Sequence, residues 1–319
     1  MTPLLADFLH NIDPFIFRVT ENFGPRWYGL SYVLGFAATF LLLRLFIKRG
    51  VCELKLESLD LFITLMALIG VMAGGRLGYM LLYDQGAFLD NPLIFFQISK
   101  GGMASHGGIA GLCLFAFFYA RYHKISWAGL GDNLVVCGPL GVFFGRLANF
   151  VNGELYGRPT DVSWAVRFPG ELFQSPNQTA ALSLGNQVDP EIGGSVERLI
   201  ETARENPGLA EQLRPLLELR HPSQLYQAAL EGLLLFLILL ALRLGWKNAP
   251  HGFITGVFFI LYALFRISME QFREPDAELI MGVTRGQFYS GFMILVGAVF
   301  LVYSLTKGRK TVTGRTREP

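Results

Sequence analysis

The chain has 319 residues, of which 52% are hydrophobic and only 16% are charged, and its net charge is +2. An average soluble domain has about 25% charged residues, so this composition argues against an ordinary soluble protein. The 28 Phe, 11 Tyr and 4 Trp exclude a disordered chain, and the small net charge does not indicate a nucleic-acid partner. The three cysteines lack CxxC and Cys/His spacing, so we expect neither a disulfide framework nor a metal site.

Seven apolar segments are each about as long as the 20 residues that a helix needs to cross a bilayer. In chain order they are 28–47, 59–83, 102–121, 129–151, 223–243, 251–272 and 286–306. A shorter apolar run at 92–99 is interpreted as a re-entrant or interfacial segment. The sequence therefore predicts an all-α polytopic membrane protein, a bundle of seven transmembrane helices that forms a single integral membrane domain over residues 1–319.

Basic residues are distributed unequally between the two alternating sets of loops. One set, counted with the C-terminal tail, contains thirteen Lys and Arg, whereas the other, counted without the long loop, contains five. Cytoplasmic loops of membrane proteins carry the excess of Lys and Arg. We therefore expect the N-terminus outside the membrane and the C-terminus in the cytoplasm.

The long polar segment 152–221 interrupts the apolar pattern and contains six prolines and the pair Gly193-Gly194. By the expected topology it lies outside the membrane. It is too short and too poor in apolar residues for an independent enzyme domain, so it is interpreted as a small extracytoplasmic arm or head. Within it, residues 195–219 have helical spacing that is interrupted at Pro207.

Ionisable residues inside a span cost roughly 2.5–3.5 kcal/mol each on insertion scales, so they are candidates for function. By the expected topology, six spans place their most polar residues toward the outer face. These residues include Tyr28, Arg76, His106, Arg146, Asn149, Asn152, Glu154, Tyr262, Arg266 and Glu270. Arg266 and Glu270 are spaced i, i+4 and can pair on one helical face. Because guanidinium groups match phosphate oxygens, the pattern predicts a polar cavity for a phospholipid headgroup.

Structural interpretations of the same residues stay open at this point. Arg146 or Arg266 alone could be an ion-pair partner, and His106 could be a hydrogen-bonding residue at a helix end. Arg76, in the run GGRLG, could be structural, and Glu231 could pair with a neighbouring helix.

A motif with many fixed positions lies at the end of the fourth span, where the chain reads GRLANFVNGELYG from Gly145 to Gly157. This run matches every fixed position of the signature of the bacterial prolipoprotein diacylglyceryl transferases, and the chain resembles that family. Five further blocks carry the resemblance, at 26–32, 74–83, 105–111, 220–232 and 265–276. The segment 171–219 and the tail after Lys307 do not align to the pattern.

The resemblance implies a reaction in which phosphatidylglycerol donates its diacylglyceryl group to the lipobox cysteine of a prolipoprotein signal peptide. A thioether forms and glycerol 1-phosphate leaves. The implied partners are phosphatidylglycerol, prolipoprotein signal peptides and membrane lipids, with no cofactor and no metal. The implied location is the bacterial cytoplasmic (inner) membrane.

The resemblance also implies roles for individual residues. His106 would be the general base for the cysteine thiol, and Arg146 and Arg266 would hold the phosphate and stabilise the departing anion. The residues implied in binding phosphatidylglycerol beside these arginines are Tyr28, Asn149, Asn152, Glu154, Gly157, Tyr262 and Glu270. An arginine could also help to generate the thiolate, so the division of roles between His106 and the arginines stays open.

Two functions of other classes remain as alternatives. A lipid transporter or scramblase could use the same phosphate-binding cavity, and a non-catalytic protein could bind signal peptides. Transport is disfavoured because the polar residues do not extend through the full depth of the spans.

Overall fold

The computed structural model describes residues 8–20, 23–97, 101–274 and 279–308. The chain divides into two compact units. Unit 1 comprises Met1–Leu34, Pro139–Leu235 and Leu261–Ile294, and unit 2 comprises Gly35–Gly138, Phe236–Ile260 and Leu295–Pro319.

Five helices among the described residues are long and apolar enough to cross a bilayer, by length and composition. They are α1 (Trp27–Lys48), Leu56–Tyr83, α6 (Trp127–Asn152), Ser223–Gly245 and α13 (Arg285–Lys307). Each agrees with an expected span to within three residues at either end. These helices confirm the prediction of a mostly helical membrane protein.

The two remaining expected spans, 102–121 and 251–272, also form helices. These helices are α5 (Ser105–His123) and α12 (Phe253–Met269), which is apolar but shorter than the five. Glycines with positive φ precede both helices, at Gly101 and Gly102 (75° and 81°) and at Gly252 (94°), so neither helix begins where its apolar run begins. The count of seven spans stays a prediction.

Two of the long helices contain π-helical segments. In the first, η1 (Leu56–Ser58) and α2 (Leu59–Leu65) precede the π-helical segment η2 (Met66–Ala73), which leads into α3 (Gly74–Tyr83). In the second, the π-helical segment η8 (Ala228–Leu234) joins α10 (Ser223–Gln227) to α11 (Leu235–Gly245). Such segments disturb the regular hydrogen-bond ladder and are frequent at functional sites.

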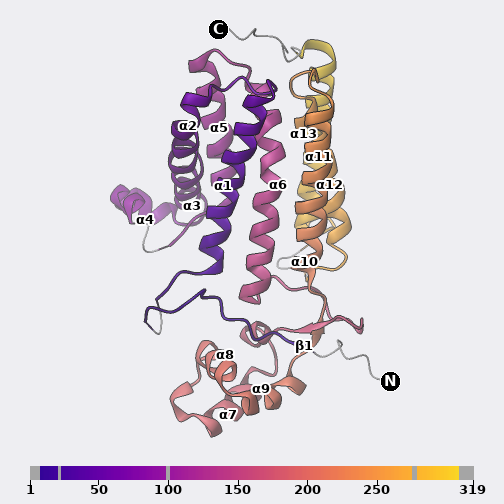
Figure 1. Cartoon of the computed structure of the whole chain (residues 1–319). Coiled ribbons are helices and arrows are strands. Elements are labelled where there is room, and N and C mark those ends of the chain that lie inside the picture. The colour runs from indigo at the N-terminus through magenta and orange to yellow at the C-terminus, as the bar shows by residue number, and fades with distance from the viewer. Residues whose placement is uncertain (1–7, 21–22, 98–100, 275–278, 309–319) are drawn as a thin grey trace. The chain divides into compact units, whose positions relative to one another are not determined.

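In unit 2, α3 and α5 lie side by side with their backbones in contact (Figure 1). A Cβ atom added to Gly74 would lie 2.7 Å from the carbonyl oxygen of Gly107. A Cβ atom added to Gly107 would lie 2.7 Å from Cα of Gly78. Only glycine permits this approach, which fixes the position of α5 against α3.

Arg76 of α3, which was expected to be either a functional or a structural residue, has a structural role in unit 2. Its side chain is buried at 6% exposure. Its guanidinium donates hydrogen bonds to the main-chain carbonyls of Ile94, Phe95, Gln97, Gly101 and Gly102. Next to it, α4 (Gln85–Asp90) leads into the short 3-10 helix η3 (Pro92–Phe96); residues 98 and 99 of the expected interfacial run lie outside the described residues.

The arm in unit 1 has a small apolar core of its own. It contains β2 (Val166–Arg167), η5 (Pro169–Phe173), α7 (Gln178–Val188), η6 (Pro190–Ile192), α8 (Val196–Glu205), α9 (Pro207–Leu213), η7 (Arg214–Leu216) and β3 (Leu219–Arg220). Its buried core residues are Leu172, Ala181, Ile192, Val196, Leu199, Ala203, Leu209, Leu213 and Leu217. The interruption expected at Pro207 is the start of α9, where the Asn206 side chain accepts a hydrogen bond from the Leu209 amide (3.1 Å).

A three-stranded sheet in unit 1 is absent from the all-α prediction. It joins β1 (Phe8–Leu9), β2 and β3 in that order, with β1 parallel and β3 antiparallel to β2. Phe8 is opposite Val166, which is opposite Arg220. Strands of two residues are too short to show an alternating pattern, so no strand was expected at these positions.

Candidate functional site: a buried cluster of arginines and carboxylates

Unit 1 brings together charged residues from α6, η8 and α12. Arg146 lies on α6, Glu231 on η8 and Arg266 on α12. Gly232 explains how closely η8 and α6 approach, since a Cβ atom there would lie 2.7 Å from Cβ and 2.8 Å from Cα of Phe143. The π-helical segment therefore places Glu231 against the helix that carries Arg146.

Glu231 is the centre of the cluster. Its side chain is 0% exposed, and its two carboxylate oxygens lie 3.9 Å from Nη2 of Arg146 and 3.6 Å from Nη1 of Arg266. Nη2 of Arg266 also lies 2.5 Å from Oε1 of Glu270, and Nη1 of Arg273 lies 3.9 Å from the same oxygen. The expected i, i+4 pair of Arg266 and Glu270 is confirmed, and so is the pairing of Glu231 with neighbouring helices.

These ion pairs leave hydrogen-bonding capacity unused. Both oxygens of Glu231 and Nη1 of Arg266 are buried without a hydrogen-bond partner among the described residues. Arg146, whose side chain is 17% exposed, also has no hydrogen bond to any residue that the structure describes. Buried polar groups in folded proteins are almost always hydrogen-bonded. A ligand that presents anionic oxygens would satisfy the free N–H groups of both arginines.

Asn149, Asn152 and Glu154 form a neighbouring group at the end of α6. The side-chain amides of Asn149 and Asn152 donate to Oε1 of Glu154, at 2.8 and 3.2 Å. Gln224 of α10 donates to the main-chain carbonyl of Glu154 at 2.7 Å. The structure thus brings these three expected residues together at the end of α6. The ion pair of Arg146 is with Glu231.

Gly157 is buried at a point where two other segments touch its backbone. Its amide donates to the carbonyl of His221 (2.8 Å), and an added Cβ atom would lie 2.7 Å from Cβ of His221 and would also meet the carbonyl oxygen of Phe272. Close backbone packing therefore accounts for a glycine here, and direct contact of Gly157 with a lipid stays a prediction.

The two expected tyrosines also belong to unit 1. Tyr28 lies at the start of α1, is 38% exposed and has its ring 5.5 Å from that of Tyr32. Tyr262 is partly buried on α12, one turn before Arg266. Their roles in lipid binding stay predictions.

His106 lies in the first turn of α5, next to Gly107, and is exposed. It belongs to unit 2, whereas the arginine cluster belongs to unit 1. Its role as a general base stays a prediction.

Two members of the cluster were not expected as site residues. Glu231 was expected only as a structural partner, because a single carboxylate in a span does not reveal its neighbours. Arg273 was not singled out, although its i, i+3 spacing from Glu270 and its place in the 265–276 block were signals that could have identified it.

Apolar helices of bilayer-crossing length and a buried, ion-paired arginine cluster are the features of a helical integral membrane protein with a buried charged site. The family model described as prolipoprotein diacylglyceryl transferase matches residues 14–303. The chain is 39% identical to the phosphatidylglycerol-prolipoprotein diacylglyceryl transferase of Bdellovibrio bacteriovorus, over 92% of this chain and 93% of that protein. It is also 39% identical to the protein of the same name from Geobacter sulfurreducens, over 89% and 90% of the two chains. The chain belongs to the prolipoprotein diacylglyceryl transferase family.

Proposed function

We propose that this chain transfers the diacylglyceryl group of phosphatidylglycerol to the lipobox cysteine of prolipoproteins, the first step of bacterial lipoprotein maturation. The cysteine sulfur bonds to the terminal glycerol carbon of the diacylglyceryl group. The bond from that carbon to the phosphate oxygen breaks, glycerol 1-phosphate leaves, and a base takes the thiol proton. Family membership and the names of the relatives support this activity.

Arg146 and Arg266 bind the phosphate in this proposal. The observation that carries it is their arrangement around Glu231, which pairs with both, while Nη1 of Arg266 and the side chain of Arg146 have no hydrogen-bond partner among the described residues. The phosphate gains negative charge as the carbon–oxygen bond breaks, and preorganised guanidinium groups stabilise that charge most where it develops. Glu231 and Glu270 position the guanidinium groups.

The other residues act on the two substrates. His106 removes the thiol proton, since an imidazole can accept a proton at neutral pH. Asn149, Asn152 and Glu154 hold the glycerol head. The lipid is also contacted by Tyr28, Gly157 and Tyr262.

The central experiment measures release of glycerol phosphate by the purified full chain in detergent. Release should require both phosphatidylglycerol and a peptide with the lipobox cysteine, and replacement of that cysteine by serine should abolish it. Release without the peptide would contradict the transferase. Lipid movement across proteoliposomes without a thioether product would instead support a scramblase.

His106→Ala tests the general base, and His123→Ala is its matched control because His123 is exposed at the other end of α5. We expect loss of turnover only in His106→Ala. Equal turnover in the two variants would remove His106 from the mechanism and leave the arginines as the groups that generate the thiolate.

The proposed topology has seven spans in the bacterial inner membrane, with the N-terminus and the arm 152–221 outside and the C-terminus in the cytoplasm. It predicts that a cysteine replacing Glu191 of the arm reacts with an impermeant maleimide added to spheroplasts, whereas a cysteine replacing Lys124 does not. Both substitutions are made in a chain with Cys52, Cys113 and Cys137 replaced by serine. The reverse labelling pattern would contradict the orientation.

A further inference from the structure

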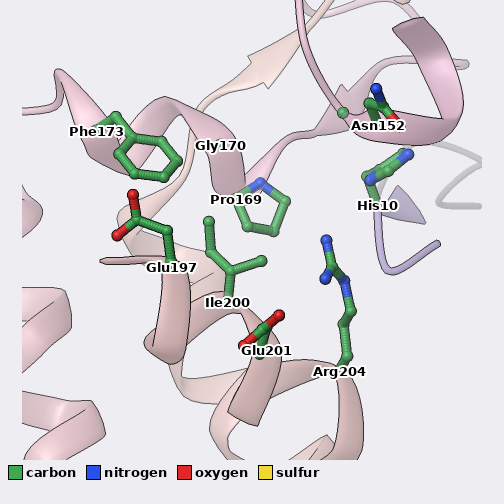
Figure 2. Close-up of a pocket in the computed structure, with 10 residues that line it drawn as sticks. His10, Asn152, Pro169, Gly170, Phe173, Glu197, Ile200, Glu201 and Arg204 are labelled. Carbon is green, nitrogen blue, oxygen red and sulfur yellow. The ribbon is translucent and has the colours of Figure 1, made fainter. Parts of the chain in front are cut away.

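Unit 1 contains a cavity outside the arginine cluster, between the arm and the end of α6 (Figure 2). Its volume is about 180 Å³. The polar side chains that line it include His10, which follows β1, Asn152 at the end of α6, and Arg204 on α8. Phe173 and Ile200 add apolar surface. The lining therefore mixes hydrogen-bonding groups with apolar side chains.

His10 supplies a buried acceptor to this cavity. The residue is 4% exposed, its ring donates to the carbonyl of Phe150, and its Nε2 has no hydrogen-bond partner among the described residues. Burial lowers the pKa of His10 from 6.5 to about 4, so the imidazole is neutral at neutral pH. In a neutral imidazole that donates from one nitrogen, the other nitrogen is an acceptor.

Arg204 supplies donors. Its guanidinium extends toward His10 in Figure 2. Glu201, which also lines the cavity, and Asp13 favour its charged form, but neither lies within 4 Å as an ion pair among the described residues. Burial lowers the pKa of Arg204, although it remains a cation at neutral pH. A second acceptor is Oδ1 of Asn152, which is buried and finds no hydrogen-bond partner in the part of the chain that the structure describes. The cavity is therefore lined by hydrogen-bond donors, from Arg204, and by hydrogen-bond acceptors, from His10 and Asn152. A peptide group complements both, because its C=O accepts and its N–H donates.

Asn152 connects the cavity to the proposed lipid site. While its Oδ1 is unpartnered, its Nδ2 donates to the same Glu154 oxygen that accepts from Asn149, one helical turn after Arg146. The cavity and the proposed lipid site thus share Asn152, and both belong to unit 1.

We propose that the cavity binds the main chain of the prolipoprotein segment that follows the modified cysteine. The inference rests on the proposed transferase function. Arg204 donates to a peptide carbonyl, and His10 and Asn152 accept from peptide N–H groups. Phe173 and Ile200 pack against the side chains of the bound prolipoprotein segment. The main-chain contacts do not depend on which side chains these are, so the cavity contributes affinity for the protein substrate without selecting one sequence.

Two synthetic peptides test the inference with the full chain in detergent. The short peptide ends at the lipobox cysteine as a carboxamide, and the long peptide continues for six residues. Arg204→Gln removes the cation and should raise KM for the long peptide about tenfold, the effect of losing a charged hydrogen bond. KM for the short peptide and for phosphatidylglycerol should not change. Ile200→Trp, which fills the cavity from its apolar side, should have the same selective effect.

Arg198→Gln is the matched control, because it makes the same change at an exposed position of α8 that does not line the cavity. An equal loss for both peptides, or no loss for the long peptide in either cavity variant, would overturn the inference. Turnover of the long peptide by the unmodified chain separates the two proposals. Its absence would contradict the transferase, whereas its presence without peptide-length selectivity in the variants would contradict only the cavity.

Discussion

The two units each bury a carboxylate among apolar helices, and they satisfy it in different ways. In unit 2, Asp132 of α6 accepts hydrogen bonds from the amides of Gly252 (2.7 Å) and Thr255 (2.8 Å) and from the Thr255 hydroxyl (2.8 Å). In unit 1, Glu231 has ion pairs at 3.6 and 3.9 Å and no hydrogen bond among the described residues. Both residues are 0% exposed.

This difference separates a structural charge from a functional one. Asp132 provides acceptors for the first amides of α12, which a helix N-terminus otherwise leaves unsatisfied, so its bonding is completed by the fold itself. Glu231 instead pairs with two arginines, and among the described residues Nη1 of Arg266 and the guanidinium of Arg146 have no hydrogen-bond partner. A buried charge that the fold leaves incompletely bonded indicates a ligand, and its replacement should affect activity more than stability.

The largest expected effect is on catalysis at the unit 1 cluster. Arg146→Ala and Arg266→Ala should each reduce turnover by about a hundred- to a thousandfold, the usual loss when a preorganised donor to a developing anion is removed. The measurement is glycerol phosphate release, with thermal unfolding in detergent to verify folding. Arg121→Ala, at an exposed position of α5, is the control. Near-normal turnover in folded Arg146→Ala and Arg266→Ala would remove the arginines from the reaction.

The next effect is on stability in unit 2. Asp132→Asn keeps the shape of the side chain but weakens three hydrogen bonds and turns an amide group toward donors. We expect the free energy of unfolding to fall by about 3 kcal/mol, with unchanged kcat for the protein that remains folded. Asp60→Asn, at an exposed position in the first turn of α2, should change neither quantity. A loss of kcat without a loss of stability in Asp132→Asn would reverse the comparison.

Glu231→Gln is the sharpest test of the comparison, because glutamine has nearly the same shape and lacks the charge. We expect kcat/KM for phosphatidylglycerol to fall about tenfold, since the two guanidinium groups lose their common anion, while the melting temperature changes little. Glu231→Asp, which retains the charge, should recover part of the loss. If Glu231 only fills space, Glu231→Gln will behave as the unmodified chain.

The smallest effect concerns pH and the buried His10. Its pKa is about 4 in the folded protein and 6.5 when unfolded, so between these values the unfolded state binds more protons. The stability that neutral His10 contributes is therefore complete above pH 6.5 and decreases as the pH falls toward 4. From pH 7 to 5.5 the loss is about 1 kcal/mol, measurable as lower amide protection factors in β1 and the arm, with the intrinsic exchange rate at each pH divided out. His10→Gln should lack this pH dependence. If the unmodified chain and His10→Gln depend equally on pH, the assignment of the effect to His10 is contradicted.

Patterns of local origin allowed much of the fold to be predicted. The long apolar helices agree with the expected spans because composition alone decides which segments a bilayer accepts. Helix α9 begins at the expected proline because proline is favoured at the first helical position. The three-stranded sheet was missed, since strands of two residues do not change the hydrophobic pattern.

For the site, the sequence determined the family, through the run from Gly145 to Gly157 and the blocks around it. It also singled out Arg146, Arg266 and Glu270 as candidates for function, because charged residues in a span are costly. Only the tertiary structure decided their arrangement, because the partner of Arg146 is Glu231, 85 residues away in the chain, on a π-helical segment brought close by Gly232. Ion pairing between helices depends on packing geometry, which a linear pattern does not contain. The cavity beside His10 likewise joins residues that are far apart in the chain, from His10 to Arg204.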